Sequence, residues 1–235
     1  MADFKYKRVL LKLSGEALAN ADGHGLDEKI TEEIASEIKK LTDAGVQVAV
    51  VVGGGNIIRG ANQESMDREK ADYMGMTATI INAMALGELF KKSGLNTKVY
   101  SAIAMDQVVD TYDIDDALKH LENCEVLILG GGTGKPYVTT DTTATLRARE
   151  LKCDCVLKAT KVDGVYDCDP VKNKDAKKFD KVSYDESIKL GLKIMDERAF
   201  EMAKESKIPI IVFNMFDKDN IVKVLQGENI GTVIS

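Results

Sequence analysis

Two short apolar runs in this chain each end in three consecutive glycines. Residues 46–52 lead into glycines 53–55, and residues 126–129 lead into glycines 130–132. Both runs suit strands that are buried on both faces of a sheet. Glycine lets backbone N–H groups come close to a ligand and adopt positive φ angles. We therefore expect two glycine loops at the carboxyl edge of one sheet, where open α/β folds bind ligands, in an arrangement that suits two phosphate-bearing ligands.

The first glycine loop is followed by Asn56 and Arg59. We expect Asn56 to cap a helix, and Arg59 to present its planar fork of donors within the first turn of that helix. Together they predict a phosphate-binding edge. A tight strand-to-helix turn with a surface arginine is the alternative, and this stretch alone leaves both open.

Predicted strands and helices alternate along the chain, which favours an α/β fold with a mostly parallel central sheet and helices on both faces. The expected strands lie within residues 8–16, 46–52, 97–100, 126–129, 155–160, 208–213 and 231–234, the last at an edge. The expected helices lie within residues 27–45, 64–93, 113–121, 142–151, 195–206 and 219–226, with a short one after Ser183. The Asp163-Gly164 turn predicts a hairpin, followed by a loop over residues 167–180. The length of 235 residues fits one domain, or one domain with two lobes.

Charge and hydropathy exclude several classes of protein. The net charge of -6 and the pI of about 5.2 argue against nucleic-acid binding. No apolar run approaches the roughly 18 residues of a membrane span, and the first residues lack an apolar signal segment. We therefore expect a cytoplasmic protein that does not bind membranes.

Cysteine and histidine usage predicts no metal site. The four cysteines contain no C-x2-C pair, and there are only two histidines, so a structural zinc site is not expected. Free thiols are the expected state of the cysteines in a reducing compartment.

Some polar residues allow two interpretations. Lys12 interrupts an apolar run, so it lies either on an edge strand or beside anionic partners. Asp72 is either an acid exposed on the surface or a residue that binds a ligand. Thr140 or Asp141 could cap the helix over residues 142–151, or the same atoms could bind a phosphate or nucleoside.

Two known phosphate motifs fail, and two arginines are expected in solvent. A Walker A loop requires a glycine five residues before Gly134-Lys135, but Leu129 stands there. Neither glycine triplet continues into a G-x-G-x-x-G fingerprint, which disfavours a dehydrogenase. Arg147 and Arg149, on the helix after the second glycine loop, are expected to be solvated.

A family resemblance runs in order from Leu10 to Thr232, nearly the whole chain. Its motifs are Lys12-Leu13-Ser14-Gly15-Glu16, Gly53-Gly54-Gly55-Asn56-Ile57-Ile58-Arg59-Gly60, Asp72-Tyr73-Met74-Gly75-Met76, Gly132-Thr133-Gly134, Thr139-Thr140-Asp141, Lys158-Ala159-Thr160-Lys161-Val162-Asp163-Gly164-Val165-Tyr166 and Val212-Phe213-Asn214-Met215. These motifs resemble the bacterial UMP kinases (uridylate kinases) of the amino acid kinase fold. The first and the Lys158 motifs are shared with related amino acid kinases, whereas the Asp72 motif and the two threonine motifs point to the uridylate branch.

The resemblance implies transfer of the ATP γ-phosphoryl group to UMP, giving UDP in pyrimidine nucleotide biosynthesis. It also implies a UMP-binding part at about residues 1–150 and an ATP-binding part at about residues 151–235. The residues it implies as catalytic are Lys12, Arg59, Asp141 and Asp196. Those implied for ATP binding are Lys12, Leu13, Ser14, Gly15, Gly55, Arg59, Thr160, Tyr166 and Asp169. Those implied for UMP binding are Gly54, Asp72, Thr133, Gly134, Lys135, Pro136, Tyr137, Val138, Thr139 and Thr140.

Regulation and assembly are also implied by the resemblance alone. The family is typically a homohexamer that GTP activates and UTP inhibits. The matching effector region is the loop of Asn20, Ala21, Asp22, Gly23, His24 and Gly25. Mg²⁺ is expected to arrive mainly with ATP, because the family lacks an all-protein metal cage.

Other functions remain as alternatives. A sister kinase acting on carbamate, glutamate or acetylglutamate has no ribose for Asp72 to hold. A non-catalytic nucleotide sensor would not need Lys12, Asp141 and Asp196 together. A DNA-binding regulator conflicts with the acidic charge balance.

Overall fold

A computed structural model describes residues 4–235 except 59–65, 169, 171, 174 and 193. Its main sheet has nine strands in the order β4-β3-β5-β2-β1-β6-β10-β11-β9, and every neighbouring pair is parallel except β10 with β11. The strands are β1 (Arg8–Leu13), β2 (Gln47–Val52), β3 (Thr97–Ser101), β4 (Asp110–Thr111), β5 (Val126–Gly130), β6 (Cys155–Thr160), β9 (Lys181–Val182), β10 (Ile210–Asn214) and β11 (Thr232–Ile234). The predicted α/β fold with a mostly parallel sheet is confirmed.

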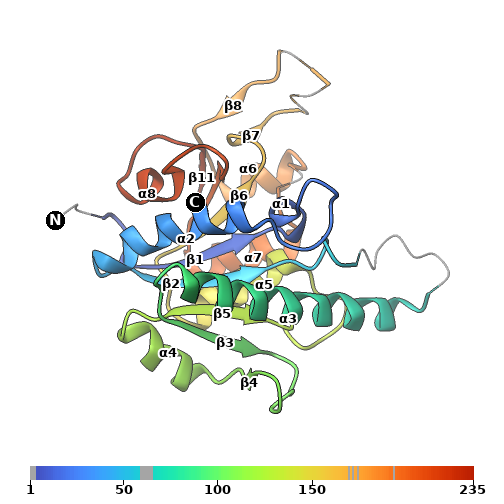
Figure 1. Cartoon of the computed structure of the whole chain (residues 1–235). Coiled ribbons are helices and arrows are strands. Elements are labelled where there is room, and N and C mark those ends of the chain that lie inside the picture. The colour runs from blue at the N-terminus through green and yellow to red at the C-terminus, as the bar shows by residue number, and fades with distance from the viewer. Residues whose placement is uncertain (1–3, 59–65, 169, 171, 174, 193) are drawn as a thin grey trace.

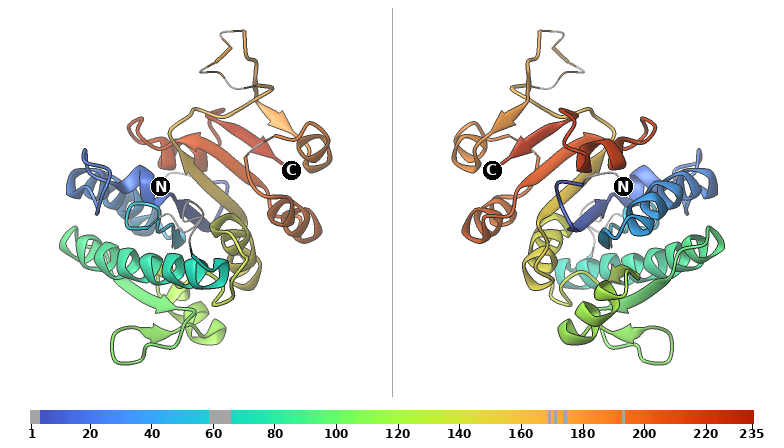
Figure 2. Two further views of the ribbon diagram at one scale, coloured as in Figure 1. Left: turned by 90° about the vertical axis from the view of Figure 1, so that its right-hand side faces the viewer. Right: turned by 90° about the vertical axis from the view of Figure 1, so that its left-hand side faces the viewer.

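Helices cover both faces of this sheet (Figure 2). They are α1 (Gly15–Leu18), α2 (Glu28–Asp43), α3 (Arg68–Lys92), α4 (Ile114–Glu122), α5 (Thr140–Glu150), α6 (Tyr184–Lys189), α7 (Glu197–Ser206) and α8 (Asn220–Leu225). Strand residues alternate between the two faces, as the two-residue repeat of a strand requires. In β1, Leu11 packs in the cluster formed with α2, α3 and α8, whereas Leu10 packs in the cluster formed with α4, α5 and α7.

Polar and glycine-rich segments follow the central strands at one edge of the sheet. β1, β2, β5 and β6 are mutually parallel neighbours, so their carboxyl ends meet there. Lys12 lies opposite Val51 of β2 and Lys158 of β6. The edge-strand interpretation of Lys12 is therefore wrong, because β1 has a neighbour on each side and Lys12 must find anionic partners at the carboxyl edge.

The Asp163-Gly164 hairpin is also wrong. β7 (Val165–Tyr166) pairs with β8 (Lys178–Phe179), across a segment expected to be a loop, and the pair projects above the main sheet in Figure 1. Side chains take the hydrogen bonds that a tight turn would need. The N–H of Val162 donates to Thr160 Oγ1, and the N–H of Val165 donates to the hydroxyl of Thr232.

Three smaller predictions also change. In the part of the chain that the structure describes, Asn56 caps no helix, and α3 begins only at Arg68 with Asp67 as its cap. Thr139, rather than Thr140 or Asp141, caps α5. The last strand, β11, is not at the edge, since β9 pairs with its outer side.

Among the described residues, no helix combines the length and the apolar character that a membrane crossing requires.

Candidate active site

A cluster of charged groups lies where β1, β6 and α5 meet. The ammonium of Lys12 is 3.1 Å from Asp141 Oδ1, and the ammonium of Lys158 donates to Asp141 Oδ2 at 2.7 Å. Lys158 also donates to the backbone carbonyl of Ile194. The register between β1 and β6 makes the two lysines direct neighbours, and Asp141 reaches both from the first turn of α5.

The charges of this cluster set its protonation. Burial raises the pKa of Asp141, but attraction to Lys12 and Lys158 outweighs it, so the pKa lies below its ordinary value. Burial lowers the pKa of Lys158, and Asp141 offsets part of that effect. Asp141 Oδ1 is buried, and among the described residues it meets the ammonium of Lys12 at 3.1 Å as an ion pair without regular hydrogen-bond geometry. Two cations held around one carboxylate leave positive charge available for an anionic ligand.

Sequence reasoning assigned no role to Lys158, although it lies in one of the motifs. The signal that could have found it is the strand pairing, since Lys158 stands beside Lys12 only when β6 is the parallel neighbour of β1. The order of strands in the sheet is not readable from the local sequence.

Asp196 is held by threonines of α5. As the N-cap of α7, its Oδ1 accepts from the N–H of Ala199 at 3.1 Å and from the hydroxyl of Thr142 at 2.7 Å. Its Oδ2 accepts from the hydroxyl of Thr139. The side chain therefore ties the start of α7 to the start of α5, beside the residue that holds both lysines.

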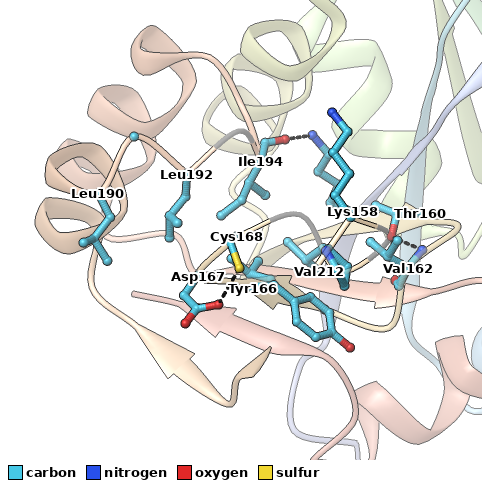
Figure 3. Close-up of a pocket in the computed structure, with 15 residues that line it drawn as sticks. Lys158, Thr160, Val162, Tyr166, Asp167, Cys168, Leu190, Leu192, Ile194 and Val212 are labelled. Atoms are coloured by element: carbon cyan, nitrogen blue, oxygen red, sulfur yellow. Dashed lines mark hydrogen bonds between the residues drawn. The ribbon is translucent and has the colours of Figure 1, made fainter. Parts of the chain in front are cut away.

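A cavity of about 630 Å³ lies on the β6 side of the cluster (Figure 3). Leu190, Leu192 and Ile194 line one side, and Thr160 and Val162 line the other. Its further lining includes Lys158, Gly164, Val165, Tyr166, Asp167, Cys168, Pro170 and Val212. Thr160 and Tyr166, both implied for ATP binding, thus line one cavity, which has apolar walls and a lysine at one end. Asp169 lies outside the described residues.

A second cavity, of about 300 Å³, lies between the two glycine loops. It is lined by Val51, Val52, Gly54, Gly55, Ile58, Arg68, Ala71, Asp72, Gly75, Met76, Thr79, Leu129, Gly132, Lys135, Tyr137, Val138, Thr139, Thr140 and Thr143. The residues implied for UMP binding that line this cavity are Gly54, Asp72, Lys135, Tyr137, Val138, Thr139 and Thr140. The other three, Thr133, Gly134 and Pro136, lie in the same segment of the chain but do not line the cavity. Gly55, implied for ATP binding, lines this cavity too. Arg59 lies outside the described residues.

Asp72 is oriented within the second cavity. Its Oδ1 accepts from Arg68 Nε at 3.0 Å, and its Oδ2 accepts from the N–H of Tyr137 at 2.7 Å. Its side chain is only 21% exposed, so it is not a free surface acid. The carboxylate joins α3 to the segment after the second glycine loop, at a place where it can also accept from a ligand hydroxyl.

The turn after β1 packs directly on the first glycine loop. The N–H of Gly53 donates to the carbonyl of Leu13 at 2.9 Å. A Cβ atom added at Gly15 would lie 2.6 Å from the carbonyl oxygen of Gly53 and 2.9 Å from the nitrogen of Gly55. Leu13, Ser14 and Gly15, implied for ATP binding, therefore adjoin both Lys12 and the first glycine loop.

The sequence predicted a solvated Arg147, but the side chain is buried, and only 7% of the residue is exposed. Its guanidinium pairs with Glu150 at 2.7 Å, donates to the carbonyl of Gly132 at 3.2 Å and stacks over the ring of Tyr112 at 4.0 Å. Arg149 is exposed, as expected. Arg147 thus holds the second glycine loop from the α5 side.

The expected effector loop is an exposed turn before α2. All six residues from Asn20 to Gly25 are exposed, and Asn20 Oδ1 accepts from the backbone N–H groups of Asp22 and His24 at 3.2 Å each. The loop lies outside the lining of both cavities described above.

The fold and this site define a phosphotransferase of one known family. Residues 7–214 match the amino acid kinase family, and the chain belongs to it. It is similar to the crystal structure of UMP kinase from Bacillus anthracis, with 39% identity, a TM-score of 0.94 and coverage of 98% of this chain and 96% of that one. It is also similar to UMP kinase from Ureaplasma parvum, with 36% identity, a TM-score of 0.92 and coverage of 98% and 99%. Uridylate kinase from Archaeoglobus fulgidus is more distant in shape, with 32% identity, a TM-score of 0.74 and coverage of 97% and 99%.

Proposed function

We propose that this protein is a UMP kinase, which transfers the γ-phosphoryl group of ATP to UMP and releases UDP and ADP. The observation that carries the proposal is the Lys12–Asp141–Lys158 cluster between two cavities of different character. Lys158 lines the first cavity, and Thr140, the neighbour of Asp141, lines the second. The likeness to the bacterial UMP kinases, over nearly the whole of both chains, supports the same activity.

The chemistry needs charge stabilisation rather than a general base. The second pKa of a phosphate monoester is about 6, so UMP is mostly dianionic at neutral pH and its phosphate oxygen can attack directly. A bond forms between that oxygen and the γ-phosphorus, and the bond from the γ-phosphorus to the β,γ-bridging oxygen breaks, leaving ADP. Negative charge on the transferred group is best stabilised by fixed cations and N–H donors.

Lys12 is the residue proposed to contact the transferred group. The family resemblance also implies a phosphate contact for Arg59, which lies outside the described residues. Asp141 orients Lys12 and Lys158 through the contacts described above, which lets two cations face a polyanion without drifting apart. Asp196 fixes the start of α5, and with it Asp141, through Thr139 and Thr142.

The first cavity is proposed to hold ATP, with Thr160 and Tyr166 at its adenosine end and residues 12–15 at its phosphates. The resemblance implies the same nucleotide for Asp169, which lies outside the described residues. The second is proposed to hold UMP, with Asp72 accepting from the ribose, Gly54 donating its N–H to the phosphate and residues 133–140 enclosing the nucleoside. Residues 158–212 supply the lining of the first cavity and residues 51–143 that of the second, which supports a division into UMP-binding and ATP-binding parts near residue 150.

Mg²⁺ is proposed to enter with ATP. The described residues contain no group of three or more His, Cys, Asp or Glu side chains that could hold a metal ion by themselves. Oxygen ligands suit Mg²⁺. Asp141, whose buried Oδ1 accepts no regular hydrogen bond from the described residues, and Asp196 are the carboxylates that would hold the ion or its waters beside the phosphates. When bound, the ion neutralises phosphate charge.

Regulation, assembly and location are proposed from the family resemblance alone. They comprise a homohexamer, activation by GTP and inhibition by UTP through the loop over residues 20–25, a cytoplasmic location and a place in pyrimidine nucleotide biosynthesis.

The direct test is ADP release by the purified protein with Mg-ATP and each of UMP, CMP, AMP, carbamate and acetylglutamate, with and without GTP. We expect turnover with UMP well above that with the other acceptors. Turnover with carbamate or acetylglutamate instead would place the protein among the sister kinases. Binding of nucleotides without turnover in any mixture would favour a sensor.

A further inference from the structure

Two buried side-chain amides form a reciprocal pair behind the first glycine loop. Asn56 directly follows that loop, Asn82 lies in the middle of α3, and they are only 2% and 1% exposed. Asn82 Nδ2 donates to Asn56 Oδ1 at 2.7 Å, and Asn56 Nδ2 donates back to Asn82 Oδ1 at 3.1 Å. Because each amide both donates and accepts, the pair fixes the orientation of both side chains.

The remaining N–H of each amide is used by a backbone carbonyl. Asn82 Nδ2 donates to the carbonyl of Gly53 at 2.7 Å, and Asn56 Nδ2 donates to the carbonyl of Gly25 at 2.5 Å. All four amide N–H groups therefore have acceptors, as buried polar groups require. The pair ties together three segments that are distant in sequence: the first glycine loop, α3 and the end of the exposed turn before α2.

A fourth segment packs on the pair. A Cβ atom added at Gly15 would lie 2.5 Å from Asn56 Oδ1, so the turn that follows Lys12 rests against the Asn56 amide. That turn borders the phosphates of the proposed ATP site, whereas Gly54, two residues before Asn56, lines the proposed UMP site. The pair thus lies between the turn that borders the ATP phosphates and the loop that borders the UMP site. Phosphoryl transfer requires the phosphates of the two nucleotides to meet.

We propose that the Asn56–Asn82 pair is a positioning device for phosphoryl transfer, which sets the first glycine loop relative to the turn after Lys12. This inference rests on the proposed UMP kinase function. Asn82 lies outside the lining of both cavities, so it acts through Asn56 and Gly53 rather than by touching a nucleotide.

A positioning role and a merely structural role predict different kinetics. Each nucleotide is held mostly by its own cavity, so a small shift of the first glycine loop leaves each binding constant nearly intact. The shift misaligns the acceptor oxygen and the γ-phosphorus, and a displacement of about 1 Å can cost on the order of 100-fold in rate. A loss confined to kcat therefore indicates positioning, whereas a loss of stability alone indicates structure.

The first variant is Asn82→Ala, compared with Leu121→Ala, which removes a fully buried side chain from α4 on the other face of the sheet. With saturating Mg-ATP and UMP, we expect kcat of Asn82→Ala to fall about 100-fold with little change in either KM. Leu121→Ala should lower the melting temperature but keep the parent kcat. Equal kcat values for the two variants, below their melting temperatures, would overturn the proposal.

The second variant, Asn82→Asp, has nearly the same shape and keeps the test decisive if Asn82→Ala does not fold. Its ionised carboxylate cannot donate to Gly53 or Asn56, but a protonated one can donate once, and burial raises the pKa of such a carboxyl group. We expect the ratio of its kcat to that of the parent to rise as the pH falls. A ratio that is flat with pH would contradict the proposal.

The same assay separates this proposal from the proposed function. UDP formation by the parent, with Asn82 variants that are equally fast, would remove the amide pair from the mechanism and leave the UMP kinase function standing. A parent protein that forms no UDP would remove the function itself.

Discussion

The two glycine loops look alike in sequence but need their glycines for different reasons. In the first loop none of the three glycines adopts a positive φ, whereas in the second Gly131 and Gly132 have φ of 75° and 57°. The first loop uses glycine only for close approach: a Cβ at Gly54 would lie 2.9 Å from both Ala78 Cβ and the carbonyl oxygen of Gly75. The second loop uses glycine also to reverse the chain direction, in a region of φ that side chains disfavour.

The loops are also held by different groups. A neutral amide pair fixes the first loop through Gly53. The second is held from α3 by Thr79, whose hydroxyl accepts from the N–H of Gly131 at 2.8 Å, and from α5 by the charged Arg147. The first loop borders both proposed phosphate sites and the second encloses the nucleoside of the acceptor. The same tripeptide therefore serves close packing in both loops and, in the second, positive φ angles as well.

The largest effect that this comparison predicts is for Gly54→Ala. The added methyl group meets the backbone and a short side chain of α3, neither of which can move aside easily. The loop must shift, and we expect kcat for UMP phosphorylation to fall about 100-fold. Steady-state kinetics measure the loss, and thermal unfolding checks that the variant is folded. A kcat close to that of the parent would show that contact with α3 does not position this loop.

The next effect is on stability. Arg147→Met removes a buried cation that bonds Glu150 and Gly132, and we expect the free energy of unfolding to fall by about 2 kcal/mol, the size expected for a hydrogen bond to a charged group. The KM for UMP should rise more than the KM for ATP, because the second loop loses its partner on α5. Arg149→Met, on the exposed side of the same helix, is the matched control and should change neither quantity. Denaturant unfolding measures the loss of stability in each variant. Equal losses in Arg147→Met and Arg149→Met would refute the role of Arg147.

The smallest effect separates the two uses of glycine most cleanly. A Cβ at Gly132 meets no atom closer than 3.4 Å, so substitution there is limited by its φ of 57°. Asparagine tolerates this conformation better than alanine does. We expect the free energy of unfolding of Gly132→Asn to be about 1 kcal/mol higher than that of Gly132→Ala. At Gly54, where φ is not positive, we expect the alanine variant to be more stable than the asparagine variant. The opposite order of stability at either position would contradict the comparison.

Local sequence was enough to predict most of the fold. Apolar runs with glycine or charged ends located the central strands. The short helix expected after Ser183 is present as α6, and Ser183 and Glu186 form a capping box at its start. The Asp163-Gly164 hairpin was wrong because threonine hydroxyls take the hydrogen bonds that the turn would have made: the nearby Thr160 accepts from Val162, and Thr232 of β11 accepts from Val165. Turn propensity is local, whereas the hydroxyl of Thr232 reaches Val165 only through the tertiary fold.

The site divides in the same way. Asp72, Asp141 and the glycine loops were identified from motifs, and the structure brings them to one edge of the sheet. Lys158 and Arg147 were missed, since their roles depend on strand order and on the burial of one helix face. The Asn56–Asn82 pair joins residues 26 positions apart, and no local pattern predicts that contact.

The most direct test of the account is UDP formation by Lys12→Ala, measured together with the binding of UMP and of a non-hydrolysable ATP analogue. The exposed Lys29→Ala on α2 serves as the matched control. Removing one donor to the developing charge costs about 100- to 1,000-fold in kcat in comparable sites, so we predict a loss of at least that order with UMP binding preserved. Turnover by Lys12→Ala at the rate of the parent and of Lys29→Ala would contradict the central claim that the Lys12–Asp141–Lys158 cluster carries phosphoryl transfer.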